Sequence, residues 1–294
     1  MKKSIGHLYA LICILLWGFI GVFNKNLLAN YSPFMLLMLE LPISYLFLMI
    51  MNHNFFKVEF GKEVYFMLAG LFGSALYYFF NKLAYSIAPA SFVSVILSIS
   101  PIIIGILTVT VLKQGKMTKA FLLGFVVAIL GIAMISFDGV TSLNVKPVGL
   151  FFAFIATFCM SIYTILLSKI SAFGIESGAV ARRCLFYGVI FVIPLLFLVD
   201  FEIKFAGLLQ PANLIGLLYL GVFSNGLATF FWNKALASIG PMKAGVYMYA
   251  SPAVGVLAAV ICLGEKITAI TIMGIVLTIA GVVISGIKEK KGEQ

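Results

Sequence analysis

A single carboxylate interrupts a long apolar stretch near the start of the chain. Glu40 lies between Leu39 and Leu41, about seven residues beyond Pro33, or roughly 10 Å at 1.5 Å per helical residue. An ionisable side chain at that depth in a hydrophobic helix is costly and usually faces a partner or a cavity. Glu40 is therefore a candidate protonation switch or binder of a substrate ammonium group. A structural ion pair or hydrogen bond to a neighbouring helix is the alternative.

The dipeptide Asn-Lys occurs twice within apolar surroundings, as Asn81-Lys82 and as Asn233-Lys234. The amides could line a central pathway. Alternatively, each lysine snorkels to the membrane interface while each asparagine hydrogen-bonds a neighbouring helix. We favour this second interpretation because both pairs lie near predicted helix ends.

Aromatic and amide side chains inside the apolar spans form a third candidate set. A binding pocket that is mostly apolar needs a few polar groups to orient its ligand. Aromatic walls would suit an aromatic or cationic substrate, whereas packing and membrane-interface belts are the alternative explanation. The candidates for substrate binding or coupling are Glu40, Trp17, Tyr78, Asn81, Tyr163, Asn225, Asn233 and Tyr247.

Two prolines lie within predicted membrane segments. Pro101 and Pro252 should each remove an intrahelical hydrogen bond and kink the helix. They occupy corresponding positions in the two halves of the chain, so they could be paired hinges or static packing kinks.

The composition identifies the elements that must position these residues. Of 294 residues, 63% are hydrophobic and only 10% are charged, and the mean hydropathy is +1.15. Soluble domains carry about 45–50% apolar and about 25% charged residues. This excludes a soluble enzyme, a nucleic-acid-binding module and a disordered chain. The expected partners are the lipid bilayer and a small-molecule substrate, not nucleic acid. We predict no catalytic residues, metal site or cofactor, and a homodimer stays open.

The predicted fold class is an all-α integral membrane protein with ten transmembrane helices. Continuous apolar runs of about 20 residues match membrane-spanning helices and exceed a barrel strand. The ten predicted segments are 7–28, 33–52, 64–85, 90–112, 119–137, 148–168, 179–199, 212–236, 242–263 and 269–287.

Positive charge indicates how these segments are oriented. Fifteen of the 20 Lys and Arg residues fall on the side of the N-terminus and five, including Lys82, on the other. Cytoplasmic loops are enriched in Lys and Arg. We therefore predict a multi-pass protein of the plasma (inner) membrane with both termini cytoplasmic.

The two halves of the sequence resemble each other. At an offset of 152, the Phe, Asn, Lys, Ser, Ile and Pro of residues 79–89 recur in residues 231–241. Gly124 and Gly131 are seven residues apart, as are Gly274 and Gly281. The predicted repeats are residues 1–140 and 145–290. Each holds five spans, and because five is odd, the second enters the membrane inverted, a pattern typical of secondary transporters.

These features resemble the drug/metabolite transporter superfamily, specifically its EamA-type ten-helix exporters, over nearly the whole chain. The resemblance lies in Trp17-Gly18, in Pro89, Pro101, Pro241 and Pro252, and in the stretch 263–268 followed by Gly274. It implies an inverted-repeat bundle, alternating access and export of small metabolites or amino acids.

The chain departs from the family pattern in its first half. The stretch 112–115 has no Glu where the second half has Glu265, and Glu40 occupies a position that is often Arg in the family. At an offset of 143, the position equivalent to Glu40 is Arg183, which is basic as the pattern expects.

The expected function is secondary transport that exports small organic metabolites, amino acids or related compounds. No Walker motif is present, so a proton gradient would drive transport, or the protein is a facilitator. Glu40 would be the coupling residue in a proton-driven mechanism. The alternatives are efflux of multiple drugs or lipophilic cations, and more remotely an integral-membrane enzyme or a non-transporting membrane protein.

Overall fold

The structure is a computed structural model that describes residues 2–88, 93, 96–137, 147–194, 206–263 and 268–285. All regular elements in these ranges are helical. Pro89, residues 264–267 of the family-like stretch and the basic residues 288–291 lie outside the described part.

The first half of the chain forms five helical segments, two of which change helix type or break along their length. Ser32 caps the second segment by accepting a hydrogen bond from Met35 N at 3.2 Å, and Pro33 occupies its first turn, where no backbone donor is needed. The elements are α1 (Lys2–Gly18) with α2 (Ile20–Leu28), α3 (Pro33–Met51), α4 (Phe60–Gly70) with η1 (Leu71–Leu76) and α5 (Tyr77–Ile87), α7 (Ser100–Thr110) and α8 (Lys119–Phe137).

The second half follows the same plan. Its elements are α9 (Pro147–Ser171), α10 (Ser177–Val192), α11 (Pro211–Leu218) with η3 (Tyr219–Leu227) and α12 (Ala228–Ile239), α13 (Pro241–Val246) with η4 (Tyr247–Ala250) and α14 (Ser251–Leu263), and α15 (Ala269–Ser285).

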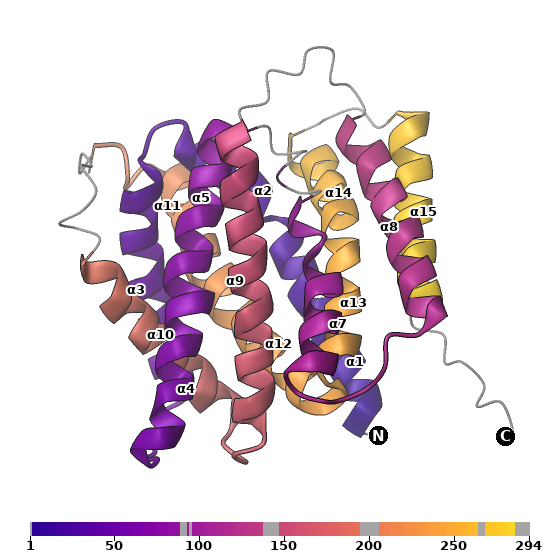
Figure 1. Cartoon of the computed structure of the whole chain (residues 1–294). Coiled ribbons are helices and arrows are strands. Elements are labelled where there is room, and N and C mark those ends of the chain that lie inside the picture. The colour runs from indigo at the N-terminus through magenta and orange to yellow at the C-terminus, as the bar shows by residue number, and fades with distance from the viewer. Residues whose placement is uncertain are drawn as a thin grey trace, which may run out of the picture.

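These segments make a ten-helix membrane fold, as predicted. Large apolar side chains are exposed on the outside of the bundle, among them Phe151 and Leu123, where only lipid can cover them. Helix α1 begins and α15 ends on the same face of the bundle, here called the N-terminal face (Figure 1). Five described runs are long and apolar enough to span a membrane: Ser4–Leu28, Pro33–Met51, Phe60–Ile87, Pro147–Ser171 and Pro211–Ile239.

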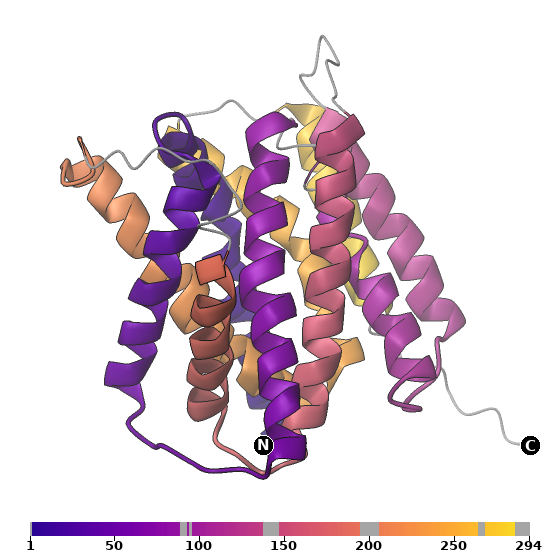
Figure 2. The ribbon, with the colours of Figure 1, turned by 60° about the vertical axis from the view of Figure 1, so that its left-hand side comes forward.

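The two halves interdigitate rather than forming separate lobes. Helix α1 packs along α12, α3 along η3, and α5 along α9, so each of these contacts joins one half to the other. Figures 1 and 2 show elements of both halves alternating around the bundle. The main buried cluster is built around Trp232 and Phe66, neither of which is exposed. A site in the centre of the bundle is therefore shared by both halves.

Helices α8 and α15 form a closely packed pair at one edge of the bundle (Figure 1). The glycines at spacings of seven lie at their contact. A Cβ on Gly131 would come within 2.6 Å of Gly274 O and Thr278 N, and one on Gly281 within 2.5 Å of Ala128 N. Only glycine allows the two backbones to approach this closely.

Replacing Gly131 by leucine is expected to lower the free energy of unfolding by about 3 kcal/mol, the upper end of the overpacking range. Two of the three nearest atoms, Gly274 O and Thr278 N, belong to the backbone and cannot rotate aside. Gly21→Leu is the matched control, because nothing lies within 4 Å of a Cβ at Gly21. Thermal unfolding of both variants in detergent checks this, and equal losses would contradict the packing argument.

The two hinge candidates begin helices instead of kinking them. Pro101 lies in the first turn of α7, after a turn at residues 98–99. Pro252 is the second residue of α14, directly after the 3-10 turn η4. The chain breaks before each proline because a proline lacks the backbone donor that would continue the preceding helix. The predicted interruption is present in both halves, whereas a hinge role stays a prediction.

Two repeat-related helices contain a π-helical stretch at mid-length. Leu71–Leu76 lies between α4 and α5, and Tyr219–Leu227 lies between α11 and α12. π-Helical turns are rare and often occur at functional sites. Nothing in our sequence analysis indicated them.

Candidate functional site

Glu40 forms a buried ion pair with Lys82. The Lys82 ammonium donates to Glu40 Oε1 at 2.8 Å, and the two residues are only 2% and 1% exposed. Lys82 therefore does not snorkel to the interface, and that interpretation was wrong. Burying the two side chains together leaves neither charge without a partner, whereas a Lys82 side chain at the interface would leave Glu40 buried and unpaired.

Two amides complete this buried network. Asn24 Oδ1 accepts from the Lys82 ammonium at 3.2 Å, and Asn225 Nδ2 donates to Glu40 Oε2 at 3.2 Å. Asn225 lies in η3, whereas the other three residues lie in the first half, so the network joins the halves. We refer to Asn24, Glu40, Lys82 and Asn225 as the charge network. It lies nearer the face opposite the N-terminal face, because α3 begins and α2 and α5 end there.

The π-helical stretch η3 supplies carbonyl oxygens to side chains of the first half. Ser44 Oγ donates to Gly221 O at 2.6 Å, and Trp17 Nε1 donates to Ser224 O at 3.2 Å. Irregular helical turns leave carbonyl groups available for such partners. These bonds hold η3, and with it Asn225, against the first half.

The second Asn-Lys pair has different surroundings from the first. The Lys234 ammonium lies 4.4 Å from the centre of the Phe230 ring and 5.3 Å from that of Tyr9. Within the described residues it has no carboxylate partner within 4 Å. The sequence repeat is therefore not a repeat of charge pairing.

Three polar side chains near the centre of the bundle have buried atoms with no hydrogen-bond partner among the described residues. They are the Tyr163 hydroxyl, the Trp232 indole N–H and both polar atoms of the Asn233 amide. Tyr163 and Asn233 lie near one another but do not reach hydrogen-bond geometry. We call these three residues the unpartnered cluster. Leaving a buried polar group unsatisfied costs about 1–3 kcal/mol, so each one requires an explanation.

Contacts from both halves hold the unpartnered cluster in place. The ring of Tyr163 lies against Gly73 of η1, where an added Cβ would come within 2.2 Å of the ring. The rings of Trp17 and Trp232 lie with their centroids 5.3 Å apart. A glycine in one π-helical stretch and an aromatic pair across the halves therefore fix two members of the cluster.

Tyr78 connects the charge network to the unpartnered cluster. Its hydroxyl lies beside Thr229 and within electrostatic range of Glu40 and Tyr163. Glu40, Tyr78, Tyr163 and Asn233 thus form a line of neighbouring polar side chains across the interface between the halves.

Not every predicted site residue joins this line. Asn81 is buried beside Lys82 in the sequence, but it is not among the residues that hydrogen-bond the charge network in the described ranges. The Tyr247 hydroxyl and His7 Nδ1 form a hydrogen bond of 2.8 Å near the start of α1. This places Tyr247 near the N-terminal face, away from the charge network.

A second ion pair lies near the N-terminal face. Arg183 donates to both carboxylate oxygens of Glu63, from Nε at 2.8 Å and from Nη2 at 2.5 Å. Its Nη1 donates to Phe56 O at 2.5 Å, and the Tyr187 hydroxyl also donates to Glu63. Arg183 thus joins α10 to α4.

The two ion pairs hold opposite ends of one long helical run. Glu63 and Lys82 both lie on Phe60–Ile87, 19 residues apart, which is roughly 28 Å at 1.5 Å per residue. Their partners, Arg183 and Glu40, occupy equivalent positions of the two repeats at the offset of 143 residues. The repeat therefore places two clamps of reversed charge at opposite membrane faces.

Sequence reasoning missed several of these residues. Asn24 carried the same signal as Asn225, an amide inside an apolar run, and could have been identified. Lys82 was misinterpreted because its position near a helix end suited snorkelling. Nothing local indicated that Glu63 and Arg183, 120 residues apart, would pair.

Comparisons with known proteins agree with this architecture. The EamA-like transporter family matches residues 4–137 and 147–287. An uncharacterized transporter from Archaeoglobus fulgidus is 29% identical over 73% of this chain and 74% of its own length. Another, from Clostridium kluyveri, is 24% identical over 99% of this chain and 95% of its own. A crystal structure with 18% identity covers 97% of each chain with a TM-score of 0.80, which supports the fold.

Proposed function

Because the chain belongs to the EamA-like transporter family, we propose that it is a secondary transporter that exports small organic metabolites, amino acids or closely related compounds. Membership of the family supports transport across a membrane. The substrate class, the direction and the mechanism are our proposal.

The observation that carries the proposal is the unpartnered cluster beside the charge network. A purely structural core would satisfy or exclude buried polar atoms. Here a hydroxyl, an indole N–H and an amide are left without partners at the interface between the halves. Secondary transporters with inverted repeats bind substrate at such an interface near the midplane. We propose that a substrate supplies the missing partners.

The charge network suits a zwitterion. An amino acid carries one ammonium and one carboxylate, which are the groups that Lys82 and Glu40 supply to each other. A bound amino acid could exchange partners with this pair, so that no buried charge is left alone. The apolar and aromatic surfaces of Trp17 and Trp232 would then face the amino-acid side chain.

Alternating access would use the two clamps in turn. We propose that opening towards one face breaks the Glu40–Lys82 pair and opening towards the other breaks the Glu63–Arg183 pair. The helix breaks before Pro101 and Pro252 would serve as hinges. This mechanism gives the repeat-related positions 40 and 183 equivalent mechanical roles.

We propose that the protein lies in the plasma (inner) membrane and that its N-terminal face is on the cytoplasmic side. Because Lys82 is buried in the bundle, it no longer counts as a loop charge. Arg182 is also buried, at 4% exposure, so the remaining bias is 14 basic residues against four, which supports the proposed orientation.

Efflux of lipophilic cations is less well supported than amino-acid export. A lone buried carboxylate would favour a cation, but Lys82 already neutralises Glu40. Aromatic rings alone would then have to hold the cation.

Efflux from preloaded cells, with and without the protein, tests the proposed function. The panel contains amino acids and quaternary ammonium compounds, each with and without a protonophore. Faster loss of one amino-acid class supports the proposal, and its sensitivity to the protonophore separates proton-driven export from facilitated diffusion. If the protein speeds the loss of the cations alone from the cells, the assignment moves to multidrug efflux. If efflux of every compound is the same with and without the protein, export is contradicted.

Tyr163→Phe is expected to make the protein more stable and the transport slower. Removing an unsatisfied buried hydroxyl relieves about 1–3 kcal/mol of desolvation cost. If the hydroxyl serves the substrate, its loss should lower transport at least tenfold. Thermal unfolding and efflux rates of the same preparation check both changes.

Tyr249→Phe is the matched control. The Tyr249 hydroxyl is also buried and unpartnered, but it packs with Phe121 near α8, outside the unpartnered cluster. We expect this variant to gain stability and keep transport. Equal transport losses in both variants would mean that Tyr163 has no special role.

A further inference from the structure

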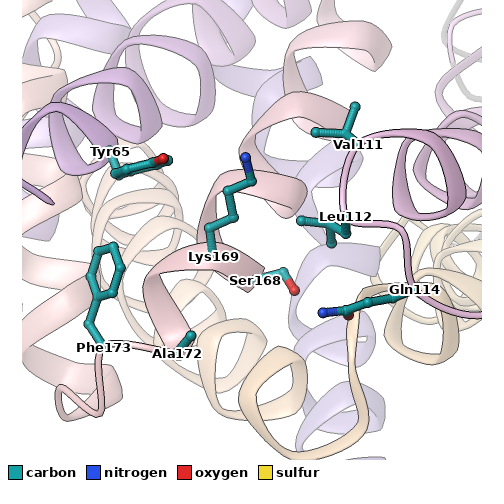
Figure 3. Close-up of a pocket in the computed structure, with 8 residues that line it drawn as sticks. All are labelled: Tyr65, Val111, Leu112, Gln114, Ser168, Lys169, Ala172 and Phe173. Atoms are coloured by element: carbon teal, nitrogen blue, oxygen red, sulfur yellow. The ribbon is translucent and has the colours of Figure 1, made fainter. Parts of the chain in front are cut away.

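A cavity lies among the ends of three helices near the N-terminal face. It has a volume of about 370 Å³ and lies between the start of α4, the end of α7 and the end of α9 (Figure 3). Its lining residues are Tyr65, Val111, Leu112, Gln114, Ser168, Lys169, Ala172 and Phe173.

The polar groups of this cavity can bind an anion. Figure 3 shows the Lys169 side chain rising between Tyr65 and Val111, with Ser168 and Gln114 near one another below it. The Lys169 ammonium lies 5.7 Å from the centre of the Tyr65 ring, and among the described residues no carboxylate lies within 4 Å of it. It therefore holds a positive charge that no acidic side chain in the described ranges neutralises.

The surroundings of the cavity are basic. Lys62 lies 5.9 Å from the centre of the lining Phe173 ring, and its carboxylate contact is to the exposed Glu59 at 3.8 Å. Lys113 lies between the lining residues Leu112 and Gln114. Two further lysines thus lie next to lining residues, one in space and one in the sequence.

The position of Lys169 on its helix points to a lipid as the source of the anion. Phe151 and Phe158 are 61% and 45% exposed on the outer face of α9. Lys169 follows Phe151 by 18 residues and Phe158 by 11, which are close to whole numbers of turns at about 3.6 residues per turn. Lys169 therefore ends the face of α9 that lies against lipid chains.

We propose that this cavity binds the headgroup of an anionic phospholipid. The phosphate would contact Lys169, with Ser168 and Gln114 as further donors, while an acyl chain would lie along the exposed phenylalanines of α9. Basic pockets between transmembrane helices are suited to such headgroups. The site is separate from the proposed substrate pathway and does not depend on the proposed function.

Lipid titration of the full-length protein in a nonionic detergent tests this site. Phosphatidylglycerol is expected to raise the midpoint of thermal unfolding, and phosphatidylcholine to raise it much less. Lys169→Gln should raise the half-saturating concentration of phosphatidylglycerol about fivefold, in line with the contribution of one basic residue. Lys169→Arg should restore much of the effect.

Lys243→Gln is the matched control, because Lys243 is an exposed lysine in the last turn of α13, outside the cavity. Equal effects of the two glutamine variants would overturn the proposal in favour of general surface attraction. The same titration is carried out with inorganic phosphate. If phosphate raises the midpoint as much as the lipid does, and this rise depends on Lys169, the proposal that the anion comes from a lipid is overturned. A midpoint without lipid that stays near wild type in Lys169→Gln establishes that the variant is folded.

Discussion

Lys82→Met is expected to lower the free energy of unfolding by about 3–5 kcal/mol and to abolish transport. The substitution leaves the Glu40 carboxylate buried without its ammonium partner, and within the described part of the chain only Asn225 still donates to it. Chemical unfolding in detergent and efflux measurements check the two parts of this prediction.

The double variant Glu40→Gln with Lys82→Met separates the two explanations of the pair. Removing both charges should restore most of the stability, because no uncompensated charge is left in the bundle. Transport should stay abolished if the pair acts on the substrate. A double variant that folds and transports at the wild-type rate would show that the ion pair is structural.

Glu59→Gln provides the control for loss of an ion pair as such. The Glu59–Lys62 pair is exposed, with 3.8 Å between its charged atoms, and such pairs contribute about 0–1 kcal/mol. We expect little change in stability or transport in this variant.

Arg183→Ala is expected to have the second largest effect. It should lower the free energy of unfolding by about 2–4 kcal/mol and reduce transport more than tenfold. Arg183 supplies two hydrogen bonds to Glu63 and one to Phe56 O, and it lies over the Phe56 ring at 4.5 Å. Because the pair is partly exposed, the cost should fall below that of a fully buried pair.

Alkylation of Cys184 gives a second readout for this variant. Cys184 is fully buried and directly follows Arg183, so opening between α10 and α4 should expose it. We expect faster labelling by a maleimide in Arg183→Ala and partial protection in Arg183→Lys, which keeps the charge but loses the bidentate contact. Lys57→Ala, an exposed change in the same region, should leave labelling unchanged. Unaltered labelling in Arg183→Ala would contradict the clamp at this face.

The sequence predicted the membrane fold more fully than the site. Long apolar runs mark membrane helices because the backbone must satisfy its own hydrogen bonds in hydrocarbon. Glu40 and Asn225 were identifiable because a polar group is conspicuous in such a run. Their partners were not, because pairing across the bundle depends on how distant helices are rotated, as the contact between Lys82 and Glu40 illustrates.

Tyr247 shows a second limit of prediction from the sequence, because it was a predicted site residue that lies away from the charge network. It has the same residue type and apolar surroundings as Tyr163, yet it lies beside His7 near the N-terminal face. Residue type alone could not separate a tyrosine at the centre of the bundle from one near its edge.

In the two helices that contain η1 and η3, the number of residues determines where the side chains of the charge network point, as much as the residue types determine what they can bind. One residue more or fewer in an α-helix rotates everything beyond it by about 100°. Loss of a single residue from the α-helical part between η1 and Lys82 would therefore turn Lys82 away from Glu40 even though every side chain of the charge network remained. The charge network therefore tolerates a change of length in a loop but not between η1 and Lys82.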